Sequence, residues 1–236
     1  MSRKEITNAQ IDNLLGSARF APVPEDRVRQ IEDTLAAGLK PVRPLAPPGV
    51  YFAAWAALFI AISLGSWRLM AGPLGWEALS GFERALIFVP LAVIAACLVF
   101  SLARQMIPAA AYQRSAAIIA AGVFLWLLVF MILSFRPMHE SAFLQNAGGC
   151  FRIGMLFALP TGMLSALLLW RGAGLTPGLL GATAGGLAGL AGLTVLEIHC
   201  PNLNLYHILA AHASVVVVCT MLGFLVSSAI GRLRSS

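Results

Sequence analysis

The chain has 236 residues, of which 59% are hydrophobic and 11% are charged, and its net charge is +6. Ordinary soluble domains are about 45–50% apolar and about 25% charged, so this composition excludes that class and indicates a membrane protein. The apolar runs are long and do not alternate with polar residues, which favours transmembrane helices over a β-barrel.

Residues 1–48 are expected to form a short cytoplasmic segment of two amphipathic helices followed by a Pro-rich tether. The apolar stripes of these helices hold Leu14, Leu15, Val28, Ile31 and Leu35. Helices this short are not stable alone, so they pack on each other or on the membrane surface, or they dock a soluble partner. Six acidic residues offset seven basic ones, so the segment is not a DNA-binding arm, and we expect no direct nucleic-acid partner.

Residues 49–230 are predicted to form a bundle of six transmembrane helices, because an apolar run of about 20 residues spans the hydrocarbon core. The expected spans are 49–67, 85–103, 115–134, 152–170, 178–196 and 208–230. Residues 231–236 follow as a short tail, and the predicted fold class is all-α. These spans contain no Asp, Glu or Lys, which disfavours a coupled transporter.

The Lys and Arg residues predict which way the bundle faces. Twelve of them fall in the two termini and in the connections after the second and fourth spans, against four on the other side. Because basic residues accumulate on the cytoplasmic side, both termini are expected to be cytoplasmic. We expect a multi-pass protein of the bacterial inner membrane, whose basic balance needs no partner other than anionic lipid.

The fifth expected span is rich in glycine. Gly181, Gly185 and Gly189 recur every four residues, a spacing that lets helix backbones approach closely in lipid. We expect tight helix packing within the chain, with homodimerisation as the alternative.

The cysteines and histidines are distributed unevenly. The predicted topology places on or near the outer face Cys150, Cys200, His139, His199, His207 and His212. His212, about a turn into the last span, is expected to hydrogen-bond between helices, and Cys97 and Cys219 are expected to pack inside spans.

The outer face is an oxidising environment, which leaves several interpretations open for these residues. In the first interpretation Cys150 and Cys200 form a structural disulfide. In the second they act as a redox-active thiol pair with His199 beside it, and in the third they make no interaction. A metal site is the further alternative, with zinc or copper as the ion. Its candidate ligands are His139, His199, Cys200 and His207, with Glu197 as an alternative to His139.

Several features together resemble a known family. "LKPVRPL" (39–45) precedes the spans, Cys150 opens the fourth span and Pro160 lies within it. "RGAGLTPGLLGATAGGLAG" (171–189) leads into the Gly-rich span, and "HCP" (199–201) follows it. This arrangement resembles the NrsF family, bacterial membrane proteins that are negative regulators of extracytoplasmic-function sigma factors. Where that family often has a Trp-Tyr pair in the last span, this chain has His207 and His212.

The resemblance implies an anti-sigma factor in a stress response. Its N-terminal segment would hold the sigma factor, and Cys150 and Cys200, at the family's two cysteine positions, would take part in sensing. No nucleotide loop, catalytic triad or paired-carboxylate site is found in the N-terminal segment, so we expect no enzyme. The competing hypotheses are a membrane enzyme or transporter subunit that uses the His/Cys cluster, and a structural protein whose external disulfide joins helices.

Overall fold

The structure is a computed structural model that describes residues 24–38, 47–70, 72–105, 113–138, 142–169 and 177–235. Every regular element in these ranges is a helix, which confirms the all-α class. The chain divides into two compact units, Met1–Pro44 and Leu45–Ser236.

The first unit contains α2, Glu25–Gly38, which begins directly after Pro24. Glu25 and Asp26 stand in its first turn, where carboxylates favour the positive end of the helix dipole. Val28 and Ile31 are 41% and 55% exposed, so two of the three predicted apolar residues of this helix are open to solvent. The side chain of Leu35 lies outside the described part of the chain, as do Leu14 and Leu15 entirely.

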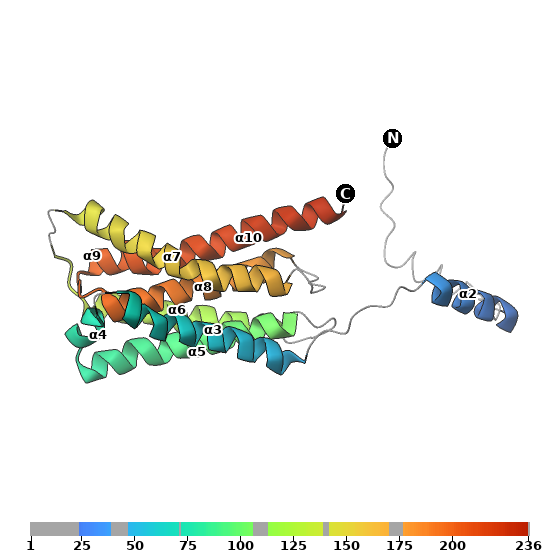
Figure 1. Cartoon of the computed structure of the whole chain (residues 1–236), viewed down its shortest axis with the longest axis horizontal. Helices are drawn as coiled ribbons and strands as arrows, with labels where there is room; N and C mark the ends of the chain where they lie inside the picture. Colours follow the sequence, from blue (N-terminus) through green and yellow to red (C-terminus); the bar gives the residue numbers. More distant parts are fainter. Residues whose placement is uncertain are drawn as a thin grey trace, which may run out of the picture. The chain divides into compact units, whose positions relative to one another are not determined.

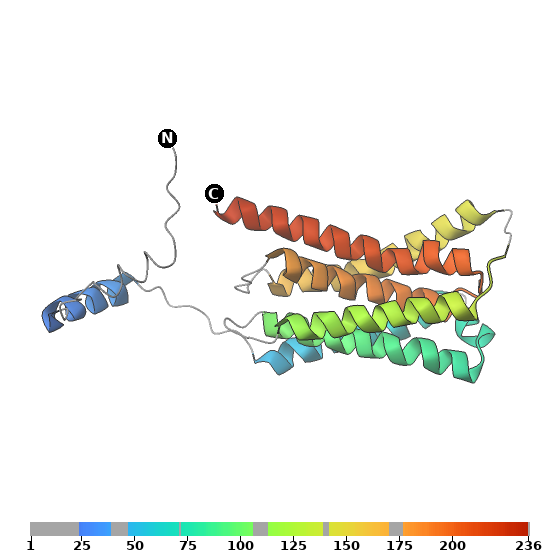
Figure 2. The same ribbon diagram turned by 180° about the vertical axis from the view of Figure 1, so that it is seen from behind.

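The second unit is a bundle of long helices that run side by side (Figures 1 and 2). Its described elements are α3 Pro48–Leu69, α4 Leu74–Ala78, α5 Gly81–Gln105, α6 Gln113–Ser134, α7 Phe143–Leu169, α8 Pro177–His199, α9 Leu205–His207, the π-helix η1 Ile208–Ala213 and α10 Ser214–Ser235. Helix α8 is central, because it contacts α3, α4, α5, α7 and α10 and is buried from Leu180 almost without interruption to His199.

Within the described residues, five helices are long and apolar enough to cross a membrane, whereas six spans were predicted. They are Gly49–Leu69, Gly81–Gln105, Phe143–Leu169, Pro177–His199 and Leu205–Leu233. Helix α6 contributes only the shorter apolar stretch Phe124–Ser134 over the residues that the structure describes, so the predicted third span does not meet the same criterion. Large apolar side chains such as Leu64, Leu133 and Leu225 are exposed on the bundle, as expected of a surface that faces lipid.

The glycine stripe of α8 packs against α10. A Cβ at Gly181 would collide with the backbone oxygen of Gly223, and a Cβ at Gly185 with that of Cys219. The stripe therefore serves helix packing within the chain, the first of the two alternatives that the sequence left open. A homodimer stays a prediction and would need another surface.

One end of the bundle gathers α4, the end of α6, the start of α7, the end of α8, and α9 (Figures 1 and 2). Helix α4 lies so close to the end of α8 that a Cβ on Gly75 would be 2.6 Å from the backbone oxygen of Glu197 and 2.7 Å from that of Cys200. The backbone N–H of Leu205 donates to the carbonyl of Arg136 at 3.2 Å. These contacts hold the segment around Cys200 in place.

Candidate functional site

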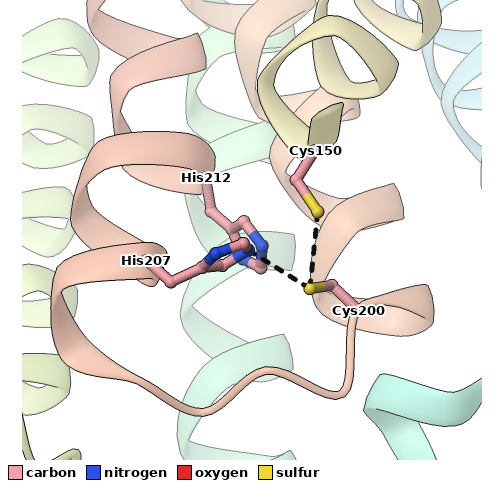
Figure 3. A group of neighbouring side chains, drawn as sticks. All are labelled: Cys150, Cys200, His207 and His212. Carbon is pink, nitrogen blue, oxygen red and sulfur yellow. Dashed lines mark hydrogen bonds between the residues drawn. The ribbon is translucent and has the colours of Figure 1, made fainter. Parts of the chain in front are cut away.

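Two cysteines meet at this end of the bundle, from different helices. Cys150 lies in α7 and Cys200 directly follows α8, and their sulfur atoms are 3.6 Å apart (Figure 3). A disulfide has an S–S distance of about 2.05 Å, so the pair consists of two thiols in contact. The structure brings together the two cysteines that the sequence pointed to, without a disulfide between them.

Two histidines complete the group. His207 Nε2 lies 3.4 Å from Cys200 Sγ, and the ring of His212 meets that of His207 edge-on with centroids 5.3 Å apart (Figure 3). One ligand atom from each of the four residues lies within 4.8 Å of the other three. We call Cys150, Cys200, His207 and His212 the Cys/His cluster.

The π-helix explains why two histidines five residues apart share one face. In an α-helix each residue turns by about 100°, so positions i and i+5 point about 140° apart. A π-helix turns by about 82° per residue, which reduces that angle to about 50°. The π-helix η1, Ile208–Ala213, lies between His207 and Ser214 and so brings His212 to the side of His207. Such π segments occur frequently at functional sites.

A buried carboxylate supports the cluster. Helix α8 continues to His199, three residues beyond the predicted end of the fifth span, and therefore carries Glu197 into the packed interior. Glu197 Oε1 lies 2.8 Å from His212 Nδ1, and both side chains are almost completely buried. His212 thus forms the interhelical hydrogen bond expected of it, while the expectation that no acidic residue lies within a span is wrong for this helix.

The surroundings of Cys200 keep its thiol protonated. A hydrogen bond with Cys150, together with burial, raises the pKa of Cys200 from 9.0 to about 12, against a smaller opposing influence of His212. A thiol with so high a pKa is a poor nucleophile at neutral pH, because the thiolate is the reactive species. A metal ion that binds sulfur would instead drive the proton off.

His199 lies outside the cluster although it precedes Cys200 in sequence. Its Nε2 is 2.8 Å from Ser66 Oγ in α3, and its Nδ1 is 2.7 Å from the carbonyl oxygen of Gly72. Both ring nitrogens are therefore engaged, and the ring ties the end of α8 to the end of α3. His139, the other predicted metal ligand, lies outside the described residues.

Asn204 orders the loop between the cysteine and the histidines. Its side chain accepts from the N–H groups of Tyr206 and Met138, each at 3.2 Å, and donates to the Met138 carbonyl at 2.8 Å. It caps α9 at Leu205 and fastens that helix to the connection between α6 and α7. Asn204 was not among the residues predicted from the sequence, although an Asn just before an apolar run is an ordinary helix-cap signal.

A family model described as NrsF, negative regulator of sigma F, matches residues 35–232. The chain belongs to the NrsF family. No curated protein and no solved structure matches it. The match confirms the resemblance that the sequence suggested, and its description names a sigma factor as the target of regulation.

In this NrsF chain the sequence pointed to Cys150, Cys200 and His207 but missed two contributors. His212 was expected to hydrogen-bond between helices and not to belong to the site, and Glu197 was considered only as an alternative metal ligand. The signal that could have found them is the rarity of ionisable residues in an apolar run: Glu197, His199, His207 and His212 stand within 16 residues of sequence. Thiols and imidazoles at these separations are suited to thiol chemistry or to binding a soft or borderline metal ion.

Proposed function

We propose that this NrsF-family protein is an integral membrane anti-sigma factor. It holds an extracytoplasmic-function sigma factor through its N-terminal segment and releases it when the Cys/His cluster senses redox or metal stress. The observation that carries the proposal is the cluster of two half-buried thiols and two buried imidazoles at one end of an apolar helical bundle, in a chain of a sigma-regulating family. A sensor needs a chemical change with two stable outcomes, and such a group supplies one.

The proposed topology has six crossings of the bacterial inner membrane, with both termini in the cytoplasm and the cluster facing outward. Helix α6, with 22 residues, has the length that one crossing requires. Six crossings return the chain to its starting side, which agrees with the excess of Lys and Arg in both termini and in the connections on that side.

The docking surface is proposed to lie on α2. Val28 and Ile31 are apolar side chains exposed on a helix of only 14 residues, which gains stability by burying them against a partner. The family match begins at residue 35, so most of α2 precedes the matched range.

A route from the sensor to the docking segment is available through His199. Its neighbour Cys200 belongs to the cluster, and its ring is bonded to Ser66 of α3, the helix that follows the Pro-rich tether in sequence. A change in the bonding of Cys200 would displace His199 and, through it, α3.

Capture of the sigma factor tests the proposal. The full chain in detergent is expected to co-purify a sigma factor encoded beside it, and Ile31→Asp with Leu35→Asp is expected to reduce capture at least tenfold. Each substitution removes an aliphatic side chain whose burial contributes about 1.5–3 kcal/mol.

The matched control is Gln30→Asp with Ala37→Asp, which adds the same charges on the opposite side of α2 by helical spacing. Normal capture by this control, with loss in the Ile31/Leu35 variant, supports the docking surface. Equal capture by both variants would place the interface elsewhere, and no capture by the wild-type chain would refute the anti-sigma role.

A metal-transporter subunit is the second candidate, because the Glu197–His212 pair is an ionisable pair buried within a candidate membrane helix. Zinc uptake into proteoliposomes that contain only this chain would favour this candidate. Tight binding without uptake would favour the sensor.

A further inference from the structure

We propose that the Cys/His cluster is a closed four-coordinate site for a divalent metal ion of the zinc type. Its ligands are the sulfurs of Cys150 and Cys200 and one imidazole nitrogen each from His207 and His212. Glu197 is a positioning residue that orients His212. The use of this site in signalling rests on the proposed function, whereas the binding of metal does not.

The separations in the cluster fit a zinc coordination shell. Zinc holds thiolate sulfur at about 2.3 Å and imidazole nitrogen at about 2.0–2.1 Å in a tetrahedron. Two sulfurs on one ion are therefore about 3.8 Å apart, and a sulfur and a nitrogen about 3.6 Å. The observed distances are 3.6 Å between the two sulfurs and 3.4 Å between Cys200 Sγ and His207 Nε2. These two separations match the shell, and the remaining ligand atoms, all within 4.8 Å of one another, would close in by up to about 1 Å around an ion.

A buried nitrogen atom gives an independent sign of a ligand. Nε2 of His212 has no hydrogen-bond partner among the described residues, and the side chain is only 1% exposed. Buried polar atoms in native proteins are nearly always paired, so such an atom calls for an unseen partner. A metal ion beside Nε2 of His212 would supply that partner.

Glu197 selects which nitrogen of His212 is available. Its carboxylate oxygen lies 2.8 Å from Nδ1, so the proton of the neutral ring stays on Nδ1 and the lone pair stays on Nε2. Histidine ligands of metal ions commonly donate their other N–H to a carboxylate, which fixes the ring and makes it a better ligand. The cluster therefore has both its ligands and the group that orients one of them.

Charge selects a divalent ion over a monovalent one. Each thiol releases its proton to solvent as its sulfur binds the ion, which leaves two thiolates and two neutral imidazoles. With an ion of charge +2 this shell is neutral, whereas with Cu⁺ it carries a net negative charge. His207, His212 and the carboxyl group of Glu197 are all buried. A net negative charge on the metal shell would therefore be unfavourable, because a buried charge needs a partner of opposite sign. Four protein ligands fill a tetrahedral shell, as in zinc sites without a catalytic role.

Metal titration of the full chain in detergent, reduced and freed of metal, tests the inference. We expect one equivalent of Zn²⁺ to bind, and Co²⁺ to give a tetrahedral spectrum with thiolate-to-metal charge transfer that Zn²⁺ abolishes. Bound Zn²⁺ should protect Cys150 and Cys200, but not Cys97, from alkylation as read by mass spectrometry. This last measurement needs no variant and is therefore independent of whether a variant folds.

Variants then test each assigned role. Cys150→Ser, Cys200→Ser and His212→Ala are expected to lose the tetrahedral cobalt spectrum, whereas Cys97→Ser and His199→Ala are expected to keep it. Glu197→Gln is expected to keep the spectrum but to bind Zn²⁺ roughly 10–100-fold more weakly, since removal of such an outer partner typically has that effect. A purely structural role for Glu197 would instead change the spectrum, or leave the affinity of the folded protein unaltered.

The outcomes separate this inference from the proposed function. No binding of Zn²⁺ by the reduced chain, or retention of the cobalt spectrum in the Cys150→Ser and Cys200→Ser double variant, would each overturn it. Capture of a sigma factor by a chain that binds no metal would leave the anti-sigma role intact. Stoichiometric Zn²⁺ binding by a chain that captures no sigma factor would support the site and refute that role.

Discussion

At the scale of single residues, the state of Cys200 decides what the cluster can do without metal. The contact with Cys150 and burial raise the pKa of Cys200 to about 12, three pH units above its ordinary value of 9.0. At neutral pH the folded protein therefore holds far less thiolate at this position than an unfolded chain does. A pair of protonated thiols reacts slowly with oxidants, which favours metal capture over rapid thiol oxidation as the primary event.

We predict that the alkylation of Cys200 by iodoacetamide in the folded, metal-free protein keeps rising with pH. The rate should increase roughly tenfold per pH unit from pH 8 to beyond 10, because the thiolate fraction grows until pH reaches the folded pKa. In urea the same residue should reach a plateau near pH 9. If the alkylation rate of the folded protein instead reached a plateau near pH 9, Cys200 would have an ordinary pKa. Any slow reaction would then be due only to poor access of iodoacetamide to the thiol. Cys150→Ala, which removes the hydrogen-bonding thiol, should shift the folded profile toward lower pH.

At the scale of helices, close approach of α8 and α10 depends on the absence of side chains. Gly181 and Gly185 leave no room for a Cβ against the backbone of α10, and Gly192 packs in the same way against Gly154 of α7. Helix α8 is thereby fixed on two sides, and its end at His199 presents Glu197 and Cys200 to α9 and η1 with little freedom. Because helix association in lipid depends on such packing, the precision of the cluster derives from these glycines.

We predict that Gly185→Ala destabilises the bundle by roughly 1–3 kcal/mol, because α10 must move away to admit the methyl group. Gly122→Ala in α6 is the matched control, since a Cβ there meets no atom within 4 Å. Alanine is the better helix former, so the control should be neutral or slightly stabilising. Thermal unfolding in detergent measures both, and equal midpoints for the two variants would contradict the packing described here.

At the scale of the whole molecule, the Cys/His cluster lies at one end of the helical bundle, the end at which α9 is labelled (Figure 1). The cluster draws its residues from α7, the end of α8, α9 and η1, so any change within it acts on several helices at once. Large apolar side chains are exposed along the outer surface of the bundle, as expected of a surface that faces lipid. A protein that passes information across a membrane requires its two functional ends to face opposite sides.

We predict that a cysteine introduced by Tyr206→Cys, in a chain whose four native cysteines are replaced by serine, reacts with a membrane-impermeant maleimide in spheroplasts. Tyr206 is 56% exposed and adjoins His207, so it reports the side of the cluster without belonging to it. Asp26→Cys in α2 should react only after lysis. Reaction of Asp26→Cys in intact spheroplasts, or of Tyr206→Cys only after lysis, would reverse the proposed orientation.

The amino-acid sequence by itself determined the class of this protein, because uninterrupted apolar runs can satisfy their backbone groups in lipid only as helices. It also predicted the packing role of Gly181, Gly185 and Gly189 from spacing, and nominated Cys150 and Cys200 from their places at helix ends. The family resemblance rested on the same local patterns, which the match over residues 35–232 confirmed.

Only the tertiary structure decided which polar residues act together. His199 adjoins Cys200 in sequence, yet the direction of its side chain at the end of α8 sends it to Ser66, away from the cluster. His212 joins the cluster because a π-helix rotates it into line with His207, and no residue pattern signals that change of pitch. Glu197 takes part because α8 continues past the last purely apolar residue. Helix pitch, helix length and side-chain direction depend on packing between distant segments, so local sequence patterns could not predict them.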